Sequence, residues 1–135
     1  MKIVLDTNVV VSALLSPEGS CAQILQLVFS GKIEALVDER ILREYETVLP
    51  RPELHIETHE VAGALRAIKR NAQSVAPVLL PASLPDPKDT PFLEVAAAAG
   101  AILITGNVKH FPKRARAGVT VMTPKEFLDS LRGAS

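Results

Sequence analysis

Short apolar stretches alternate along the chain with longer segments in which apolar residues recur every three or four positions. The short stretches are rich in Ile, Val and Leu and too short for helices, so they predict buried strands at 3–5, 33–37, 101–105 and 119–122. The longer segments have the period of an amphipathic helix. They predict helices at 9–15, 20–30, 38–49, 58–71, 90–99 and from 124 onward.

Local signals support these boundaries. Asp38 has the residue type of a helix N-cap, and Ser20 and Thr90 are expected to cap two further helices. The segment Thr123-Pro124-Lys125-Glu126 is typical of a capping box that opens the last helix. The apolar, proline-flanked segment 75–80 predicts an edge strand, and 81–88 is expected to be a loop.

Strands that alternate with helices predict an α/β fold, specifically a three-layer α/β/α sandwich with a mainly parallel central sheet. Right-handed crossovers then bring the carboxyl ends of the strands to one edge of the sheet. A length of 135 residues suits one domain, so a single domain is expected over residues 1–135.

Composition narrows the cellular setting. The only cysteine, Cys21, excludes a disulfide within the chain and agrees with a reducing compartment. The chain starts without the basic and apolar regions of a secretion signal, and no apolar run has the length of a membrane span. A cytoplasmic protein without a membrane segment is therefore expected.

Charge is balanced overall but uneven along the chain. The formal net charge is zero, so nucleic acid could be bound only through a local basic patch. Lys109, Lys113 and Arg114 lie in one stretch without an acidic residue. This stretch is either a solvated loop or a phosphate-contacting surface. With one Tyr, four Phe and no Trp, a nucleic acid would be held by its backbone or shape rather than by base stacking.

Several acidic residues fall where the carboxyl edge of the sheet is expected. Asp6 follows the first strand and 105–107 follows a later one, while Asp86 and Asp89 precede a helix and Glu44 lies inside another. Carboxylates brought together repel one another unless protonated or neutralised by a cation. An all-oxygen site suits Mg²⁺ or Mn²⁺, and such ions assist phosphodiester hydrolysis.

Each of these residues also has an ordinary structural explanation. Asp6 and Asp89 could simply cap helices, and Glu44 could be a surface residue of its helix. Turn chemistry beside Pro87 would account for Asp86, and a turn after Gly106 for Asn107. Thr7 and Asn8 could bond only to nearby backbone.

Four segments in this order resemble the PIN-domain family: Asp6-Thr7-Asn8, Leu42-Arg43-Glu44, Asp86-Pro87-Lys88-Asp89 and Ile104-Thr105-Gly106-Asn107. The resemblance spans nearly the whole chain, and the nearest branch is that of the VapC-type toxins. No single segment is specific, whereas their order and spacing together are.

The resemblance implies an Mg²⁺- or Mn²⁺-dependent ribonuclease. Asp6, Glu44 and Asp89 match the catalytic, metal-binding acids, with Asp86 and Asn107 as further candidate ligands, and Thr7, Asn8 and Thr105 as substrate-positioning residues. At two positions where the family often has an acid, this chain has Asn107 and His110. Asn107 offers an uncharged oxygen and His110 prefers softer metals, which favours one bound ion over two.

The resemblance also implies the toxin of a type II toxin–antitoxin pair, which forms a homodimer and binds a small antitoxin protein. A short DNA-binding protein encoded in the adjacent reading frame would support that pairing. Two rival functions stay open. A phosphatase of the haloacid-dehalogenase type typically has a second Asp where this chain has Asn8. A catalytically degenerate PIN fold would bind RNA or a protein without cutting.

Overall fold

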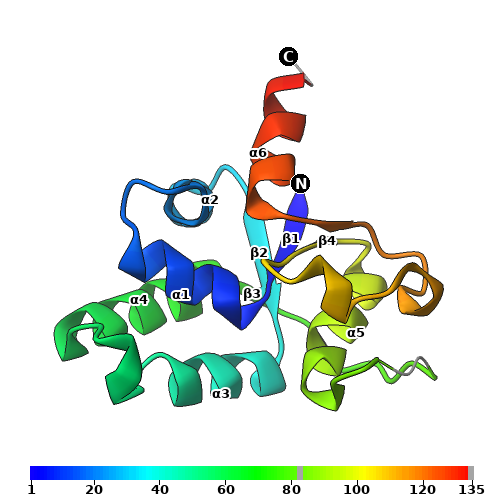
Figure 1. Ribbon diagram of the computed structural model, residues 1–135, viewed down its shortest axis with the longest axis horizontal. Helices are drawn as coiled ribbons and strands as arrows, with labels where there is room; N and C mark the ends of the chain where they lie inside the picture. The colour runs from blue at the N-terminus through cyan, green and yellow to red at the C-terminus, as the bar shows by residue number, and fades with distance from the viewer. Residues whose placement is uncertain (82–83, 134–135) are drawn as a thin grey trace.

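Short strands alternate with helices in the computed structural model, which describes residues 1–81 and 84–133 (Figure 1). The strands are β1 (Lys2–Leu5), β2 (Glu34–Val37), β3 (Gln73–Ser74), β4 (Ile102–Ile104) and β5 (Val121–Met122). The α-helices are α1 (Thr7–Leu15), α2 (Ser20–Phe29), α3 (Glu39–Val48), α4 (Thr58–Asn71), α5 (Thr90–Ala99) and α6 (Pro124–Gly133). Short 3₁₀ turns are η1 (Pro52–Leu54), η2 (Pro87–Asp89), η3 (Val108–His110) and η4 (Lys113–Ala115).

Within the described residues the strands form one five-stranded sheet of order β3-β2-β1-β4-β5, with every pair parallel. In the central pair, Ile3 lies opposite Ile102 and Leu5 opposite Ile104. The first three strands run outward from β1 to β3, and the chain then returns to the other side of β1 to form β4. The predicted α/β fold with a parallel central sheet is confirmed.

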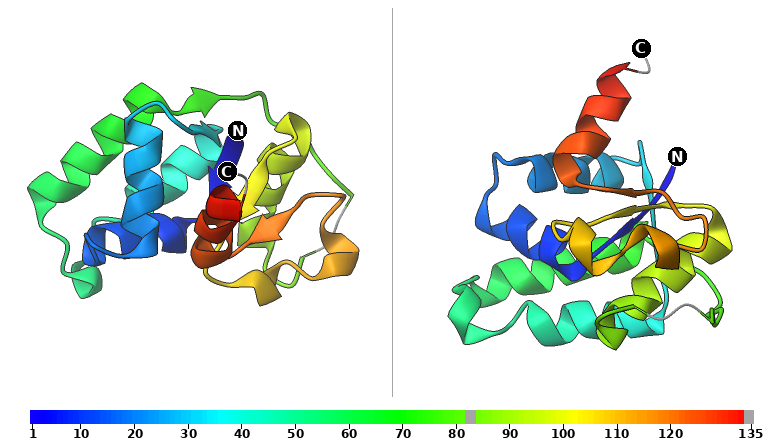
Figure 2. Two further views of the ribbon diagram at one scale, coloured as in Figure 1. Left: turned by 90° about the horizontal axis from the view of Figure 1, so that it is seen from above. Right: turned by 45° about the vertical axis from the view of Figure 1, so that its right-hand side comes forward.

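The direction of each crossover decides which face of the sheet its helices cover. The chain moves one way from β1 to β3 and the opposite way to β4, so right-handed crossovers put α5 on the face opposite α1 and α2. Helix α5 packs against β1, β2 and β4, while α1 and α2 pack against each other. Figure 2 shows these two groups of helices on either side of the strands.

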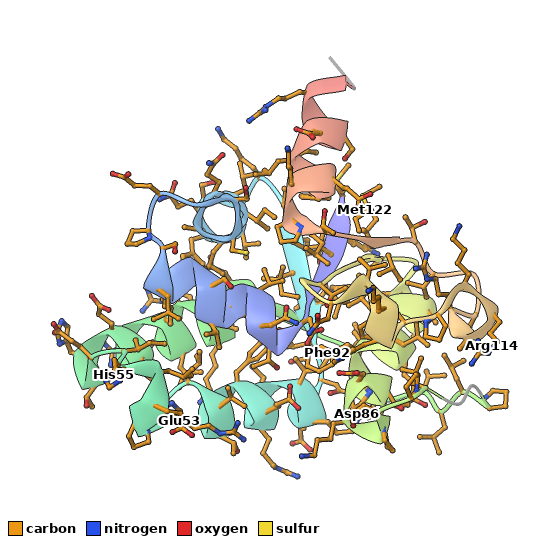
Figure 3. The ribbon with its side chains drawn as sticks, in the orientation of Figure 1. Glu53, His55, Asp86, Phe92, Arg114 and Met122 are labelled. Carbon is orange, nitrogen blue, oxygen red and sulfur yellow. The ribbon has the colours of Figure 1, made fainter. Side chains whose placement is uncertain are left out.

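The core lies between these layers. Ile3, Val4 and Leu103 of the central strands are fully buried, and so is Phe92, which α5 places near the centre of the molecule (Figure 3). A parallel sheet covered on both faces needs near-continuous apolar strands, which explains the unbroken Ile-Val-Leu sequence of β1.

Two of the predicted capping signals act as expected. The Asp38 side chain accepts a hydrogen bond from the backbone N–H of Ile41 at 3.0 Å. In the last helix, Thr123 and Glu126 exchange bonds of 2.9 and 3.1 Å between side chain and backbone, which is the geometry of a capping box. Ser20 and Thr90, expected as caps, are instead the first residues of their helices, preceded by Gly19 and Asp89.

The strand predicted at 75–80 is wrong. The edge strand is the two-residue β3, which pairs with Leu36 and Val37, and only one further bond follows, from Val75 N–H to the Val37 carbonyl. Beyond Val37 the neighbouring chain turns into α3, so residues 76–80 have no strand beside them. Pro77 also lacks an N–H for a ladder. The loop expected at 81–88 contains η2 from Pro87, and its residues 82 and 83 lie outside the described residues.

A buried ionic network ties this segment to two helices. Glu94 of α5 is 2 % exposed and accepts bonds of 2.6 Å from Arg40 Nη1 of α3 and from the backbone N–H of Leu80. Arg40 also donates to Asp38 through Nε and Nη2, at 2.9 and 2.7 Å. Each buried oxygen of Glu94 therefore has a donor, which is the condition for burying a carboxylate at low cost.

No helix in the described part of the chain is both long enough and apolar enough to cross a membrane.

We predict that Glu94→Ala lowers the free energy of unfolding by about 3 kcal/mol, because it removes one arm of the Arg40 pair and leaves the Leu80 N–H without its acceptor. Urea denaturation measures the change. The control is Glu46→Ala, which removes an exposed ion pair of 3.4 Å with Lys69 and should cost under about 0.5 kcal/mol. Equal stability of the two variants would contradict the role of the network.

Candidate functional site

The candidate site lies where the winding of the sheet reverses direction. From β1 the chain crosses over to β2 on one side, and it later returns to form β4 on the other side of β1. The connections that follow β1 and β4 therefore lead in opposite directions along the sheet. Such a switch point at the carboxyl ends of parallel strands is where open α/β sheets bind ligands. Asp6 follows β1 and Thr105 follows β4.

Asp6 and Thr105 bond directly across this point. Thr105, which is completely buried, donates from Oγ1 to Oδ2 of Asp6 at 2.7 Å, and Asn8 Nδ2 lies 3.4 Å from the same oxygen. Asp6 occupies the N-cap position of α1, but its side chain makes no capping bond to that described helix. Burial raises the pKa of the Asp6 carboxyl, and the bond from Thr105 partly offsets that rise.

Backbone groups hold these side chains in turn. Thr105 Oγ1 accepts a bond of 2.9 Å from the N–H of Asn107, and Asn8 Oδ1 accepts one of 3.0 Å from the N–H of Gly106. A Cβ atom at Gly106 would lie 3.4 Å from Asn8 Oδ1, which is an ordinary van der Waals contact, so the approach of the two loops does not require a glycine. The side chain of Thr105 thus reaches the loop after β1, and the side chain of Asn8 reaches the loop after β4. In both bonds the loop after β4 supplies the donor.

Glu44 reaches the same region from α3. Thr7 donates a hydrogen bond from its hydroxyl to Oε2 of Glu44, which joins the start of α1 to α3. The next residue, Tyr45, is buried and donates from its phenol to the backbone carbonyl of Leu5 at 2.5 Å. Two adjacent α3 residues therefore anchor the helix to the end of β1, and Glu44 is not a free surface side chain.

Asp89 comes to the site from the start of α5. Its residue is only 9 % exposed, and Oδ2 lies 3.1 Å from Nδ1 of His110 in η3. Burial, followed by the negative charge of Asp6, raises the pKa of Asp89 to about 6, against a smaller lowering by His110 and a further rise from Asp86. The electrostatic effect of Asp6 on Asp89 means that the two carboxyls are close enough to repel one another.

Asp86, Thr7 and Asn8 line a cleft beside these acids, whereas Thr105 is completely buried and does not line it. Asp86 Oδ1 accepts a bond of 2.9 Å from the N–H of Lys88, which is the turn role that the sequence left open. The cleft has a volume of about 390 Å³. Its polar lining consists of Thr7, Asn8, Ser12, Glu44, Arg51, Asp86, Lys88 and Asp89.

The predicted basic stretch lies farther out. Lys109 belongs to η3, and Lys113 and Arg114 belong to η4; all three are exposed, and none lines the cleft. Figure 3 shows Arg114 at the rim of the molecule, whereas Asp86 lies near the start of α5. Asn107 is likewise exposed and enters the network through its backbone N–H.

The donor set fits a hard divalent cation in its chemistry. Asp6, Glu44 and Asp89 offer oxygen ligands only, and none of them has a Lys or Arg ion pair within 4 Å in the described part of the chain. Burial, and after it the nearby charge of Asp6, raises the pKa of Asp89. Over residues 1–81 and 84–133, no three His, Cys, Asp or Glu side chains converge closely enough to hold an ion. Small side-chain movements would have to complete the site.

Comparison with known proteins agrees with this arrangement. The PIN domain family matches residues 2–109, which is most of the chain. The chain belongs to the PIN domain family. The expected family is therefore confirmed, and the match includes β1 to β4 and all three acids of the candidate site.

Individual proteins similar to this one match nearly the full length of the chain. The uncharacterized protein MJ1680 of Methanocaldococcus jannaschii is 29 % identical over 140 residues, which cover 96 % of this chain and 90 % of that protein. VapBC2 from Rickettsia felis has a TM-score of 0.62 at 16 % identity, covering 91 % of this chain and 98 % of that one. VapBC-1 from nontypeable Haemophilus influenzae has a TM-score of 0.61 at 14 % identity, covering 93 % and 99 %.

The sequence did not predict the contact that His110 makes, and it missed cleft residues that include Arg51 and Lys88. His110 contacts Asp89, and Arg51 and Lys88 line the cleft. A signal for Lys88 was present in the Asp86-Pro87-Lys88-Asp89 segment, because a residue between two site acids must lie near them. The contact of His110 joins residues 21 positions apart, for which the sequence holds no local signal.

We predict that Thr105→Val raises the pKa of Asp6 further in the metal-free protein. Valine keeps the shape of the buried side chain but cannot donate the bond that lowers this pKa. Carboxyl ¹³C NMR titration measures the shift. Thr47→Val is the control, because Thr47 bonds only to the Arg43 carbonyl on the exposed face of α3. An unchanged Asp6 titration in Thr105→Val would show that the bond has no electrostatic effect.

Proposed function

We propose that this PIN-domain protein is a divalent-metal-dependent ribonuclease that hydrolyses RNA phosphodiester bonds. The observation that carries the proposal is the placement of Asp6, bonded to Thr105 at the switch point of the sheet, next to a cleft lined by Glu44 and Asp89. Uncompensated carboxylates at this place suit a cation and a phosphate ligand, and the family membership supports a nuclease.

Asp6, Glu44 and Asp89 would hold Mg²⁺ or Mn²⁺, with Asp86 and Asn107 as further oxygen donors. When bound, such an ion lowers the pKa of water and offsets negative charge on a phosphodiester. His110 beside Asp89 is a poor ligand for these ions and instead keeps one carboxylate oxygen oriented.

The expected positioning residues act on the acids as well as on substrate. The Thr105 hydroxyl fixes Oδ2 of Asp6, and the Thr7 hydroxyl fixes Oε2 of Glu44. Each bond occupies one carboxylate oxygen and leaves the second oxygen of that group for other contacts. Thr7 and Asn8 also line the cleft, where their polar atoms can reach a substrate phosphate. The outlying Lys109, Lys113 and Arg114 would contact RNA farther from the acids.

A second part of the proposal concerns partners. We infer that the protein is the toxin of a type II toxin–antitoxin pair, because two proteins of the same fold are VapBC proteins. A small antitoxin and a homodimer in the cytoplasm belong to this inference. Helices α1, α2 and α4 border a mainly apolar hollow of about 360 Å³, lined by Ala13, Leu14, Pro17, Phe29 and Ala64, among others. Leu15 beside it is 51 % exposed, which suits an interface.

A degenerate PIN fold that binds RNA or a protein without cutting is the alternative. The observations that favour it are Asn107 in place of an acid and the pairing of His110 with Asp89. The lack of three converging ligands among the described residues also agrees with it. Metal binding and cleavage separate the two functions.

We predict that Asp6→Asn and Asp89→Asn each reduce RNA cleavage at least about 100-fold. Loss of a residue that only supports a metal ligand typically lowers activity about 10- to 100-fold, so loss of a ligand itself should lower it at least as much. Cleavage of total RNA with Mg²⁺ or Mn²⁺, with the cut sites mapped, is the measurement. Asp129→Asn on the exposed face of α6 is the matched control and should cleave as the wild type does. Full activity in Asp89→Asn would refute the assignment.

We also predict that Mn²⁺ binds to the wild-type protein and raises its melting temperature, and that Asp89→Asn abolishes both effects. A ligand that binds only the folded state stabilises it by RT ln(1 + [L]/Kd). Calorimetric titration and thermal unfolding measure the two effects without RNA. Absence of heat at millimolar Mn²⁺ would favour the binding module over the nuclease.

A further inference from the structure

Two arginines, Arg43 within α3 and Arg51 after it, lie close in sequence to Glu44 of the candidate site. Arg43, Thr47 and Arg51 are spaced by four residues, and this row lies next to the row that contains Glu44. Residues four apart lie on one face of a helix. Arg51 lies beyond the end of α3, next to η1, so its place beside Arg43 and Thr47 rests on the hollow that all three line and not on helical spacing.

These residues line a hollow that joins the acidic cleft. The hollow has a volume of about 330 Å³ and is lined by Arg40, Arg43, Glu44, Thr47, Val48, Arg51 and Lys88. Four of these, Glu44, Val48, Arg51 and Lys88, also line the cleft. A ligand in the cleft can therefore extend along α3 without leaving the lined surface. We name this hollow the basic groove.

The positive charge of the basic groove is largely unpaired. Arg40 is engaged by Asp38 and Glu94, whereas Arg43, Arg51 and Lys88 are exposed and have no ion pair within 4 Å with a carboxylate of the described chain. Arg43 and Thr47 also line a second hollow, together with Glu39, Leu42 and Glu46. Unpaired positive charge thus gathers on the side of α3 that meets the cleft.

An anion that enters the cleft meets two kinds of surface. The acids repel it unless a cation lies between, while Arg51 and Lys88 at the shared boundary attract it. Lys88 comes from η2 beside Asp89, and Arg51 from the chain after α3, so the two cations come from different elements that border one opening. Successive phosphates of a nucleic-acid strand would meet this arrangement with one phosphate near the acids and the next among the cations.

We propose that the basic groove binds backbone phosphates of single-stranded RNA on one side of the bond that is cut, through Arg43, Arg51 and Lys88. The proposal rests on the proposed ribonuclease function and gives the strand a direction across the site. Helix α3 and the segment η4 lie on opposite sides of β1 (Figures 1 and 2). The basic groove and the stretch with Lys113 and Arg114 therefore contact opposite ends of one bound strand.

The chemistry of the basic groove favours backbone contact over base recognition. Its lining holds Arg, Lys, Thr and Val but no aromatic side chain on which a base could stack. Contacts of this kind are electrostatic, so their loss weakens binding and reduces its dependence on salt for every RNA sequence.

The test compares RNA binding by the wild type and Arg51→Ala/Lys88→Ala, with a fluorescent oligouridylate of roughly 12 nucleotides, a usual span for single-strand sites. EDTA prevents cleavage, and anisotropy is measured between about 50 and 200 mM salt. The matched control is Lys2→Ala/Arg70→Ala. Lys2 opens β1 and Arg70 lies in the last turn of α4, so both lie toward the amino edge of the sheet.

We expect Arg51→Ala/Lys88→Ala to raise the Kd about tenfold and to reduce the slope of log K against log salt by about 1.4, or 0.7 for each lost phosphate contact. Arg43→Ala should reduce the slope by about 0.7. The control should bind as the wild type does. In cleavage assays the double variant should raise KM, because the substrate loses phosphate contacts made on binding.

Several outcomes would overturn the proposal. Wild-type affinity and salt slope in Arg51→Ala/Lys88→Ala would do so, and so would an equal loss in the Lys2→Ala/Arg70→Ala control, which would indicate diffuse charge. If the basic groove binds an acidic protein segment instead of RNA, Arg51→Ala/Lys88→Ala should bind RNA as the wild type does. Failure of the nuclease function has a different signature: the wild type then cleaves no RNA with Mg²⁺ or Mn²⁺, while binding in EDTA still depends on Arg51 and Lys88.

Discussion

The pairing of β1 with β4 is the constraint on which the site depends. The bond from Asp6 N–H to the Ile104 carbonyl, at 2.9 Å, fixes where β1 ends relative to its neighbour. From there Thr105 reaches the Asp6 carboxylate, and Asn8 reaches the Gly106 N–H. A slip of one residue in this register would turn every side chain of β1 to the other face. The core of β1 and the orientation of Asp6 are therefore set by the same ladder.

The fold buries carboxylates in two different environments. Glu94 has a guanidinium and a backbone N–H on its two oxygens, so its charge is compensated within the fold. Asp6 and Asp89 have hydroxyl, amide and imidazole neighbours instead, and the pKa of each carboxyl is raised. Charge that the fold leaves uncompensated is available to a ligand, which distinguishes the site from the structural network only a few residues away.

Much of the fold could be predicted because its signals are local. Helical periodicity and capping chemistry act within a few residues, and Asp38 and the Thr123–Glu126 box form the bonds expected of them. The proximity of Asp6 to Thr105 also followed from the sequence, because both come directly after strands of one parallel sheet. The strand expected at 75–80 failed because a strand needs a partner, and β2 ends at Val37.

The sequence by itself determined the order of the elements and the positions of Asp6, Glu44 and Asp89 near one edge of the sheet. Only the tertiary structure decided what each carboxylate touches. Three arrangements bring together residues that are 21 to 54 positions apart in the sequence. They are the contact of His110 with Asp89, the ion pair of Glu94 with Arg40, and the lining of one groove by Arg51 and Lys88. Such contacts depend on how helices pack across the sheet, and no local pattern encodes the distance between two side chains on different elements.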